Sequence, residues 1–445
     1  MNTKAKVQNF INKISNEESK TLIANFFSLG FIQGTNFLLS ILTFPYIIRT
    51  VGVENFGIVT FFQALMFYFT VLTDYGFNLS ATKEVSTHRG NLLKVSAIFS
   101  EVLATKTILF VASLFAIFAF FFFLPEYRIY ITLTLFSLTI VLGQLIIPTW
   151  FFQGIEKMKY ITYINIINRA LYAILIFLYI KQKDDYIYIN LINGVSSIVG
   201  GILILGIAFK KFQIKVHLPS LEQIKQQLEE GWNIFFSNVT VTIANNTNIL
   251  ILGFYANPLV LGYYSIAEKI FIIFRSFAII LHQVIYPRVC FLAQESTSML
   301  THFLRKTTAV IIAAFLSLSI VTFFLSDYII YLVSGQYIDE ASLILRIIAI
   351  GPLMAALAVP ASQVMLANQL SKDYAVILSI GAVLNVSLNF ILAYYFKAVG
   401  TAICILVTET VVVCTLYYVL YKYHPKYIFF NRKAIAKQSD YLEFE

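Results

Sequence analysis

The most constraining feature of this chain is a series of long apolar segments separated by short polar breaks. Twelve such segments occur, and each is close to the roughly 20 apolar residues that an α-helix needs to cross a bilayer. Because backbone groups in lipid must be hydrogen-bonded internally, spans of this kind are helical. The sequence therefore predicts an all-α polytopic membrane protein with about twelve transmembrane helices. The segments fall at about 22–48, 56–77, 97–124, 129–152, 161–180, 186–209, 233–254, 262–287, 307–333, 341–366, 374–396 and 399–421.

Composition and charge agree with this class. The 445 residues are 59% hydrophobic and only 12% charged, whereas a soluble domain carries roughly 25% charged residues. This excludes a soluble enzyme or a nucleic-acid-binding protein, so the net charge of +9 does not indicate a nucleic-acid partner. With the N-terminus inside, 22 Lys and Arg residues fall in cytoplasmic segments and 5 in outer loops, which predicts that both termini are cytoplasmic.

The longest polar interruption divides the apolar segments into two sets of six. Within it, Ser220 and Gln223 have the spacing of a capping box, which predicts a short amphipathic helix on the inner interface. The predicted organisation is a cytoplasmic tail at 1–20, an N-terminal six-helix lobe at 21–210, a linker helix at 211–231, a C-terminal six-helix lobe at 232–421 and a cytoplasmic tail at 422–445.

The two halves resemble each other weakly at corresponding spans. Gly57 opens the second span and Gly262 opens the eighth, and in this alignment Gln63 falls on Glu268. Repeats related by an axis along the membrane normal are a known plan of transporters. We therefore expect two pseudo-symmetric lobes around a central cavity, although chance similarity between apolar segments remains the alternative.

Charged residues inside predicted spans are the main candidates for function, because charge at membrane depth is costly and usually faces a cavity or a partner. Arg49, Asp74 and Arg346 lie near span ends, so an alternative to a functional role is that their side chains extend to the headgroups. For Glu101 and Lys106, the alternative is a structural ion pair with each other. The cations of interest are Arg49, Lys106, Arg169, Lys269, Arg275 and Arg346, and the acids that can couple transport to an ion are Asp74, Glu268 and Glu409.

The seventh span is rich in amides, which cannot face hydrocarbon without partners. Two interpretations remain open for these side chains: hydrogen bonds between helices, or a cavity wall that binds hydroxyl groups. The residues concerned are Asn238, Asn245, Asn246 and Asn248.

Signals of cofactor or metal chemistry are absent from the sequence. The chain has no phosphate-binding Gly-rich loop, so it has no built-in ATPase. Its three cysteines and five histidines have no metal-ligand spacing, which predicts neither a metal site nor a disulfide framework. We expect no cofactor.

Three stretches resemble a known family. The first runs through Pro45-Tyr46, Glu54-Asn55-Phe56-Gly57 and Asp74-Tyr75-Gly76-Phe77, the second is Pro148-Thr149-Trp150-Phe151-Phe152-Gln153-Gly154, and a looser third includes Gly400 and Thr408-Glu409. They are similar to motifs of the bacterial oligosaccharide-lipid flippases of the Wzx type. That family belongs to the multidrug/oligosaccharidyl-lipid/polysaccharide exporter superfamily.

The resemblance implies a bacterial inner-membrane protein that exports undecaprenyl-diphosphate-linked repeat units for O-antigen or capsule by alternating access. Proton or sodium coupling is compatible with it. The six cations would then attract the diphosphate, and the amides of the seventh span would bind sugar hydroxyls. Expected partners are the lipid-linked oligosaccharide, membrane lipid and other membrane proteins of glycan assembly.

Two alternatives stay open on sequence grounds. A drug or cation antiporter of the same superfamily would prefer an acidic cavity, whereas deep cations here are at least as numerous as deep acids. A membrane glycan polymerase or ligase would present a sizeable outer loop, whereas only short outer loops are predicted.

Overall fold

The computed structural model describes residue 39 and residues 42–423, and every regular element in this part of the chain is a helix. Residues 42–51 are helical and lead into the first labelled helix. The helices of the first half are α2 (Val53–Asp74), α3 (Phe77–Thr87), α4 (Leu92–Phe123), α5 (Ile131–Ile146), α6 (Thr149–Gly154), α7 (Lys159–Tyr179) and α8 (Tyr186–Lys211), with 3-10 turns at η1 (Pro125–Tyr130) and η2 (Lys183–Asp185).

The second half begins with α9, a helix that spans Leu221–Tyr255. The helices after it are α10 (Pro258–Glu295), α11 (Thr297–Phe324), α12 (Ser326–Ser334), α13 (Asp339–Ile348), α14 (Gly351–Ala367) and α15 (Ser371–Tyr423).

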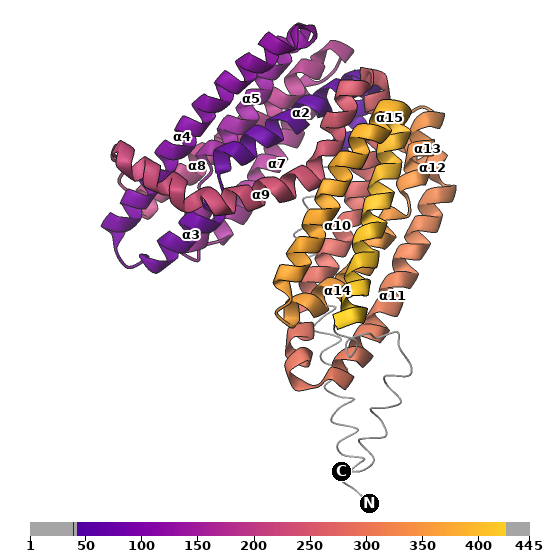
Figure 1. Cartoon of the computed structure of the whole chain (residues 1–445). Coiled ribbons are helices and arrows are strands. Elements are labelled where there is room, and N and C mark those ends of the chain that lie inside the picture. The colour runs from indigo at the N-terminus through magenta and orange to yellow at the C-terminus, as the bar shows by residue number, and fades with distance from the viewer. Residues whose placement is uncertain (1–38, 40–41, 424–445) are drawn as a thin grey trace, which may run out of the picture.

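The helices form two bundles, which we call the N-lobe (α2–α8) and the C-lobe (α10–α15). Figure 1 shows the bundles meeting at one end and diverging toward the other, with α9 crossing between them. The lobes meet where residues 48–55 face the turn 334–338, and we call this the seam end. The opposite end contains residues 212–220 and is called the linker end. One apolar core runs through the seam end and includes buried residues of both lobes.

The predicted spans correspond to observed helices wherever the structure describes them. Nine segments of the described residues are long and apolar enough to cross a membrane. Among these, α15 contains two predicted spans, which a kink at Lys397 (φ 51°, ψ −131°) separates. The tight approach after this break depends on Gly400, since an added Cβ would lie 2.1 Å from the Leu392 carbonyl oxygen. The chain is thus a multi-pass membrane protein, and the count of twelve stays a prediction.

The first predicted span, 22–48, lies largely outside the described residues, as do the two predicted tails. The predicted linker helix begins where the sequence indicates, with Ser220 and Gln223 forming the capping box. It does not end before the seventh span, however, and continues as one helix to Tyr255. A single helix therefore contains both the predicted linker helix and the predicted seventh span.

The weak sequence repeat has a direct counterpart where the lobes touch. Gly57 of α2 and Gly262 of α10 pack so closely that a Cβ on Gly57 would lie 2.6 Å from the Gly262 nitrogen. One turn further, the hydroxyls of Thr60 and Ser265 are hydrogen-bonded at 2.8 Å, and these residues have the same offset of 205 positions. Contact between a residue and its own counterpart is expected on a two-fold axis. The pseudo-symmetry axis therefore passes between α2 and α10.

Candidate functional site

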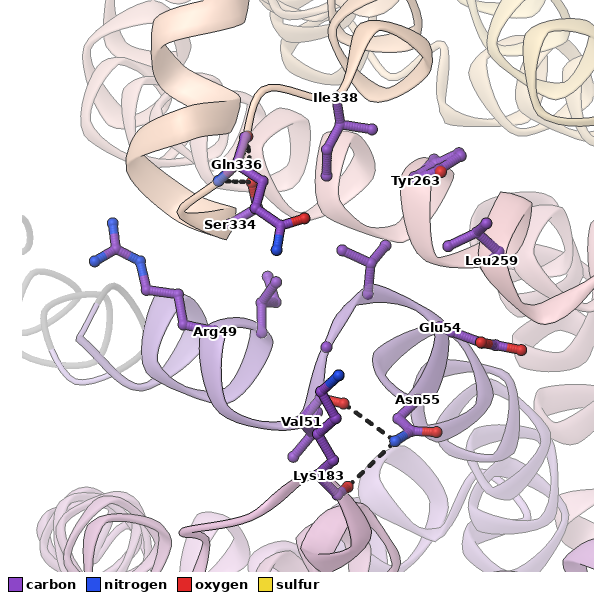
Figure 2. A pocket seen from close by; sticks show the side chains of 13 residues that line it. Arg49, Val51, Glu54, Asn55, Lys183, Leu259, Tyr263, Ser334, Gln336 and Ile338 are labelled. Atoms are coloured by element: carbon purple, nitrogen blue, oxygen red, sulfur yellow. Dashed lines mark hydrogen bonds between the residues drawn. The ribbon is translucent and has the colours of Figure 1, made fainter.

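The seam end contains a pocket of about 310 Å³ that both lobes line. Figure 2 shows Gln336 and Ile338 on the C-lobe side, opposite the helix that carries Val51 and the start of α2. The Asn55 amide ties the N-lobe wall together by donating to the carbonyls of Val51 at 3.1 Å and Lys183 at 3.2 Å. The lining is Ile48, Arg49, Val51, Gly52, Val53, Glu54, Asn55, Lys183, Leu259, Tyr263, Ser334, Gln336 and Ile338.

Arg49 lies at this pocket and bridges the lobes. Its Nη2 donates a hydrogen bond of 2.5 Å to the carbonyl of Leu332 in α12. The neighbouring Gly335 has φ +76°, and a Cβ there would lie 3.5 Å from Arg49 Cγ. The predicted diphosphate cation Arg49 is therefore part of the contact that closes the seam end.

Lys106 and Asp74 form a salt bridge inside the N-lobe. The Lys106 Nζ lies 2.7 Å from Asp74 Oδ1 and also donates to the Gln144 carbonyl at 3.2 Å. Only 2% of the Lys106 side chain is exposed, against 29% for Asp74. A predicted substrate-binding cation and a predicted ion-coupling acid are thus joined to each other.

The alternative of a pair between Glu101 and Lys106 is wrong. Residues five apart on a helix point about 140° away from each other, whereas neighbours on one face are three or four apart. Glu101 is buried and instead accepts hydrogen bonds from the side-chain amides of Gln223 at 3.0 Å and Gln227 at 3.1 Å. Gln227 Nε2 also donates to Glu84 at 3.1 Å. These contacts fasten the first turns of α9 to the N-lobe.

The C-lobe contains a second intramembrane salt bridge, between Arg275 of α10 and Glu409 of α15. Arg275 Nη2 lies 3.0 Å from Glu409 Oε1, and the guanidinium stands 6.0 Å from the centre of the Phe271 ring. The side chains are 36% and 16% exposed. This predicted substrate cation is therefore paired but accessible.

Arg346 of α13 has partners on α12. Its guanidinium is paired with Asp327, and its Nε donates to the Ser326 hydroxyl at 2.8 Å. The side chains of Arg346 and Asp327 are 38% and 47% exposed. This pair links two short helices near the seam end.

Glu268 and Lys269 are adjacent on α10 but lie in different surroundings. Glu268 is buried, and its Oε1 accepts a hydrogen bond of 3.0 Å from the Tyr264 hydroxyl. Lys269 is half-buried, and no carboxylate among the described residues lies within 4.0 Å of its Nζ. The structure therefore places an unbridged ammonium next to a buried carboxyl on the helix that borders the N-lobe.

The remaining predicted residues divide by what the structure describes. Arg169 is exposed on α7. Asn248 is buried, and its Oδ1 accepts a hydrogen bond of 3.0 Å from the Asn389 amide, which fits the helix-to-helix interpretation for this residue. The side chains of Asn238, Asn245 and Asn246 lie outside the described residues.

Sequence reasoning did not identify two polar groups in the lobes. In the N-lobe, Gln63 donates to Asn190 at 2.8 Å, and the Asn190 amide donates to Ser137 at 2.7 Å. In the C-lobe, Asn385 and Asn389 are buried, and their Oδ1 atoms have no hydrogen-bond partner among the described residues. The i, i+4 spacing of the two asparagines is a signal that could have found them.

Comparisons with known proteins agree on the family. A family model described as "Polysaccharide biosynthesis protein" matches residues 22–293. A protein of Escherichia coli (strain K12) that carries the name of an O-antigen transporter is 31% identical over 403 residues, which cover 89% of this chain and 96% of that protein. A protein of the same name from Shigella dysenteriae is 27% identical over 396 residues, covering 87% and 97%.

Solved structures share the fold. The lipid II flippase MurJ in an inward closed conformation is 17% identical with a TM-score of 0.67, covering 88% of this chain and 87% of that chain. An inward-facing multidrug transporter of the MATE family and the MOP superfamily has a TM-score of 0.67 at 14% identity, covering 85% and 92%. An outward-facing transporter of that family has a TM-score of 0.56 at 13% identity, and the match covers 90% of this chain and 94% of that chain.

Proposed function

Because this chain belongs to the polysaccharide biosynthesis protein family, we propose that it flips undecaprenyl-diphosphate-linked oligosaccharide repeat units across the bacterial inner membrane for O-antigen or capsule assembly. The family is one of transporters, so the polymerase or ligase alternative is discarded. The observation that carries the proposal is the likeness to O-antigen transporters along 89% of the chain. Both termini are proposed to be cytoplasmic, which puts the linker end inside.

The cargo has three parts with different physical requirements. A polyprenyl tail can stay in lipid, sugars need hydrogen-bond partners, and a diphosphate carries about two negative charges. Among the deep cations, Arg275 is paired yet accessible, and Lys269 has no carboxylate of the described residues in salt-bridge range. At an effective dielectric of about 20, one ion pair at about 4 Å is worth roughly 4 kcal/mol. These two cations are the best supported candidates to attract the diphosphate.

A cation in the transport site can be paired with an acid when no cargo is bound, as Arg275 is with Glu409. Glu409 lies 3.0 Å from Arg275 and would neutralise this cation while no cargo is bound. A diphosphate that approaches Arg275 would replace the carboxylate, which then becomes available to a proton or a sodium ion. Glu409 is therefore the leading coupling candidate, and Glu268 and Asp74 are the others.

Alternating access requires the seam contacts to break in each cycle. These contacts include the Arg49–Leu332 hydrogen bond and the Thr60–Ser265 hydrogen bond. The higher TM-score against the inward-facing transporter than against the outward-facing one supports assigning this structure to an inward-facing state. Cargo would enter from the linker end and leave when the seam opens.

Complementation tests this function. In a bacterium that lacks its own flippase and supplies the matching repeat unit, the chain should restore surface glycan, and without it single lipid-linked units should accumulate on the inner leaflet. Lys269→Ala should lower surface glycan while the protein stays folded in the membrane. Normal export by Lys269→Ala, Arg275→Ala and Arg169→Ala alike would refute the cationic site.

The fold shared with MATE transporters supports one rival, a drug or cation antiporter. Efflux of cationic dyes from cells that express the chain separates the two functions. Dye efflux without restored glycan would replace the flippase proposal.

A further inference from the structure

The linker end of the N-lobe concentrates positive charge. Three helix connections of this lobe, with the adjoining helix ends, meet there at residues 83–94, 156–159 and 210–215. Together they contain eight Lys or Arg residues and two acids, Glu84 and Glu156. One of the acids, Glu156, is already paired with Arg89 at 2.8 Å. We call this set the basic end: Lys83, Arg89, Lys94, Lys157, Lys159, Lys210, Lys211 and Lys215. None of these cations belongs to the transport site described above.

Two of these lysines converge on one tyrosine. Lys159 at the start of α7 has its Nζ 5.6 Å from the centre of the Tyr160 ring, and Lys211 at the end of α8 has its Nζ 5.4 Å from the same ring. Both lysines are exposed, and the ring is fixed by contact with Phe152 and Phe212. Two exposed ammonium groups thus lie close to one ring whose position is set by its aromatic neighbours.

An open depression of the surface shares Lys159 with this group, whereas Tyr160 and Lys211 are not part of its lining. It has a volume of about 430 Å³ and is lined by Glu156, Lys157, Met158 and Lys159. Met158 is 59% exposed, so the depression has an apolar side chain beside its ammonium groups. Space, positive charge and an apolar contact therefore coincide at the start of α7.

The position along the helices matches the lipid headgroups. Lys159 begins α7 and Lys211 ends α8, so both lie where membrane spans leave the apolar layer. Leu93 and Leu218 on neighbouring segments are largely exposed, as expected at an interface with lipid. α7 packs mainly against α8, and none of its residues lines the pocket at the seam end.

We propose that Lys159, Lys211 and Tyr160 bind the phosphate of an anionic glycerophospholipid at the linker end. The two ammonium groups supply charge, the Tyr160 hydroxyl supplies a hydrogen bond, and Met158 contacts the start of an acyl chain. Basic pockets between spans on the cytoplasmic side are suited to such headgroups. A bound lipid offsets the repulsion between the two lysines and fixes the N-lobe at the membrane surface while the C-lobe moves.

The test uses the purified full chain in a neutral detergent, titrated with dioctanoyl phosphatidylglycerol or dioctanoyl phosphatidylcholine. The rise of the thermal midpoint with lipid concentration gives an apparent Kd. Phosphatidylglycerol should bind at least tenfold more tightly than phosphatidylcholine. Lys159→Gln with Lys211→Gln should weaken phosphatidylglycerol binding about 25-fold, since one lysine near an anionic surface contributes roughly fivefold.

The matched control changes two lysines at the other end of the same helix pair, Lys181→Gln with Lys183→Gln, and should alter the Kd less than twofold. Equal losses in the two double variants would show a nonspecific charge effect and overturn the site. Equal binding of the two lipids would overturn it as well. Undecaprenyl diphosphate is the third titrant. If the double variant at Lys159 and Lys211 loses as much affinity for it as for phosphatidylglycerol, the site belongs to the cargo and the phospholipid assignment is wrong. Single variants at Lys159 and Lys211 give the same answer if the double variant does not fold.

Discussion

Two salt bridges deep in the described helices, Lys106–Asp74 in the N-lobe and Arg275–Glu409 in the C-lobe, differ in accessibility. In the N-lobe, Lys106 is 2% exposed and has a second acceptor in the Gln144 carbonyl. In the C-lobe, Arg275 is 36% exposed, and Glu409 is its partner at 3.0 Å. The ammonium of Lys106 is therefore buried against two protein acceptors, whereas Arg275 has donors and surface that a third group can reach.

This difference separates structural charge from transport charge. A buried cation with two fixed acceptors holds α2, α4 and α5 together and cannot exchange partners without unpacking the lobe. A half-exposed guanidinium beside a carboxylate can exchange at lower cost, because water or a phosphate oxygen can replace each lost bond. We infer that the N-lobe pair stabilises the fold and that the C-lobe pair contacts the cargo.

The largest expected effect is on stability. Lys106→Met should destabilise the N-lobe by about 3–5 kcal/mol, because it leaves the Asp74 carboxylate in a largely buried position without its partner. The measurement is the free energy of unfolding of the purified protein in detergent. Transport should fall only as far as the folded amount falls.

The matched control for this change removes both charges. Lys106→Met with Asp74→Asn should recover most of the lost stability, since a neutral pair of similar volume often replaces a buried ion pair without penalty. A double variant as unstable as the single one would show that Lys106 acts through packing alone. If Lys106→Met is stable but does not transport, Lys106 contacts the cargo, and the two salt bridges no longer differ in role.

The next effect is on transport. Arg275→Gln should lower glycan export at least tenfold with most of the protein still folded, because it removes a cation that the diphosphate needs. Glu409→Gln should keep cargo binding or strengthen it, because Arg275 loses its competitor, and should slow release. Cargo binding measured by native mass spectrometry, together with the export rate in cells, distinguishes the two variants. Equal loss of binding in both would make this pair structural, like the one in the N-lobe.

The helices themselves could be predicted from the sequence because apolar length alone determines a membrane span. The predicted segment 186–209 corresponds to α8, observed at Tyr186–Lys211, and 97–124 corresponds to α4, observed at Leu92–Phe123. The capping box at Ser220 was equally local and is confirmed. The short helices α3, α6 and α12 were not predicted, since they lie at the ends of spans where periodicity is too brief.

Partners of the deep charges were not predictable in the same way. Lys106 pairs with Asp74, 32 residues away on another helix, and nothing local in the sequence indicates which helices adjoin. Glu101 likewise takes its partners from α9, more than 120 residues later. The repeat was more informative, because symmetry requires that Gly57 and Gly262 occupy equivalent positions, and the two are in contact at the axis.

The smallest effect is expected at the exposed pair near the seam, which extends the comparison to a third level of burial. Asp327→Asn removes the charge opposite Arg346 but keeps an oxygen that can accept its hydrogen bond. Because both side chains are well exposed, at 38% and 47%, the cost in unfolding free energy should be about 0–1 kcal/mol. Unfolding of this variant beside Lys106→Met, under the same conditions, tests whether burial governs the ranking. A loss of about 3 kcal/mol or more for Asp327→Asn would mean that position at the seam, rather than accessibility, determines what an ion pair contributes in this protein.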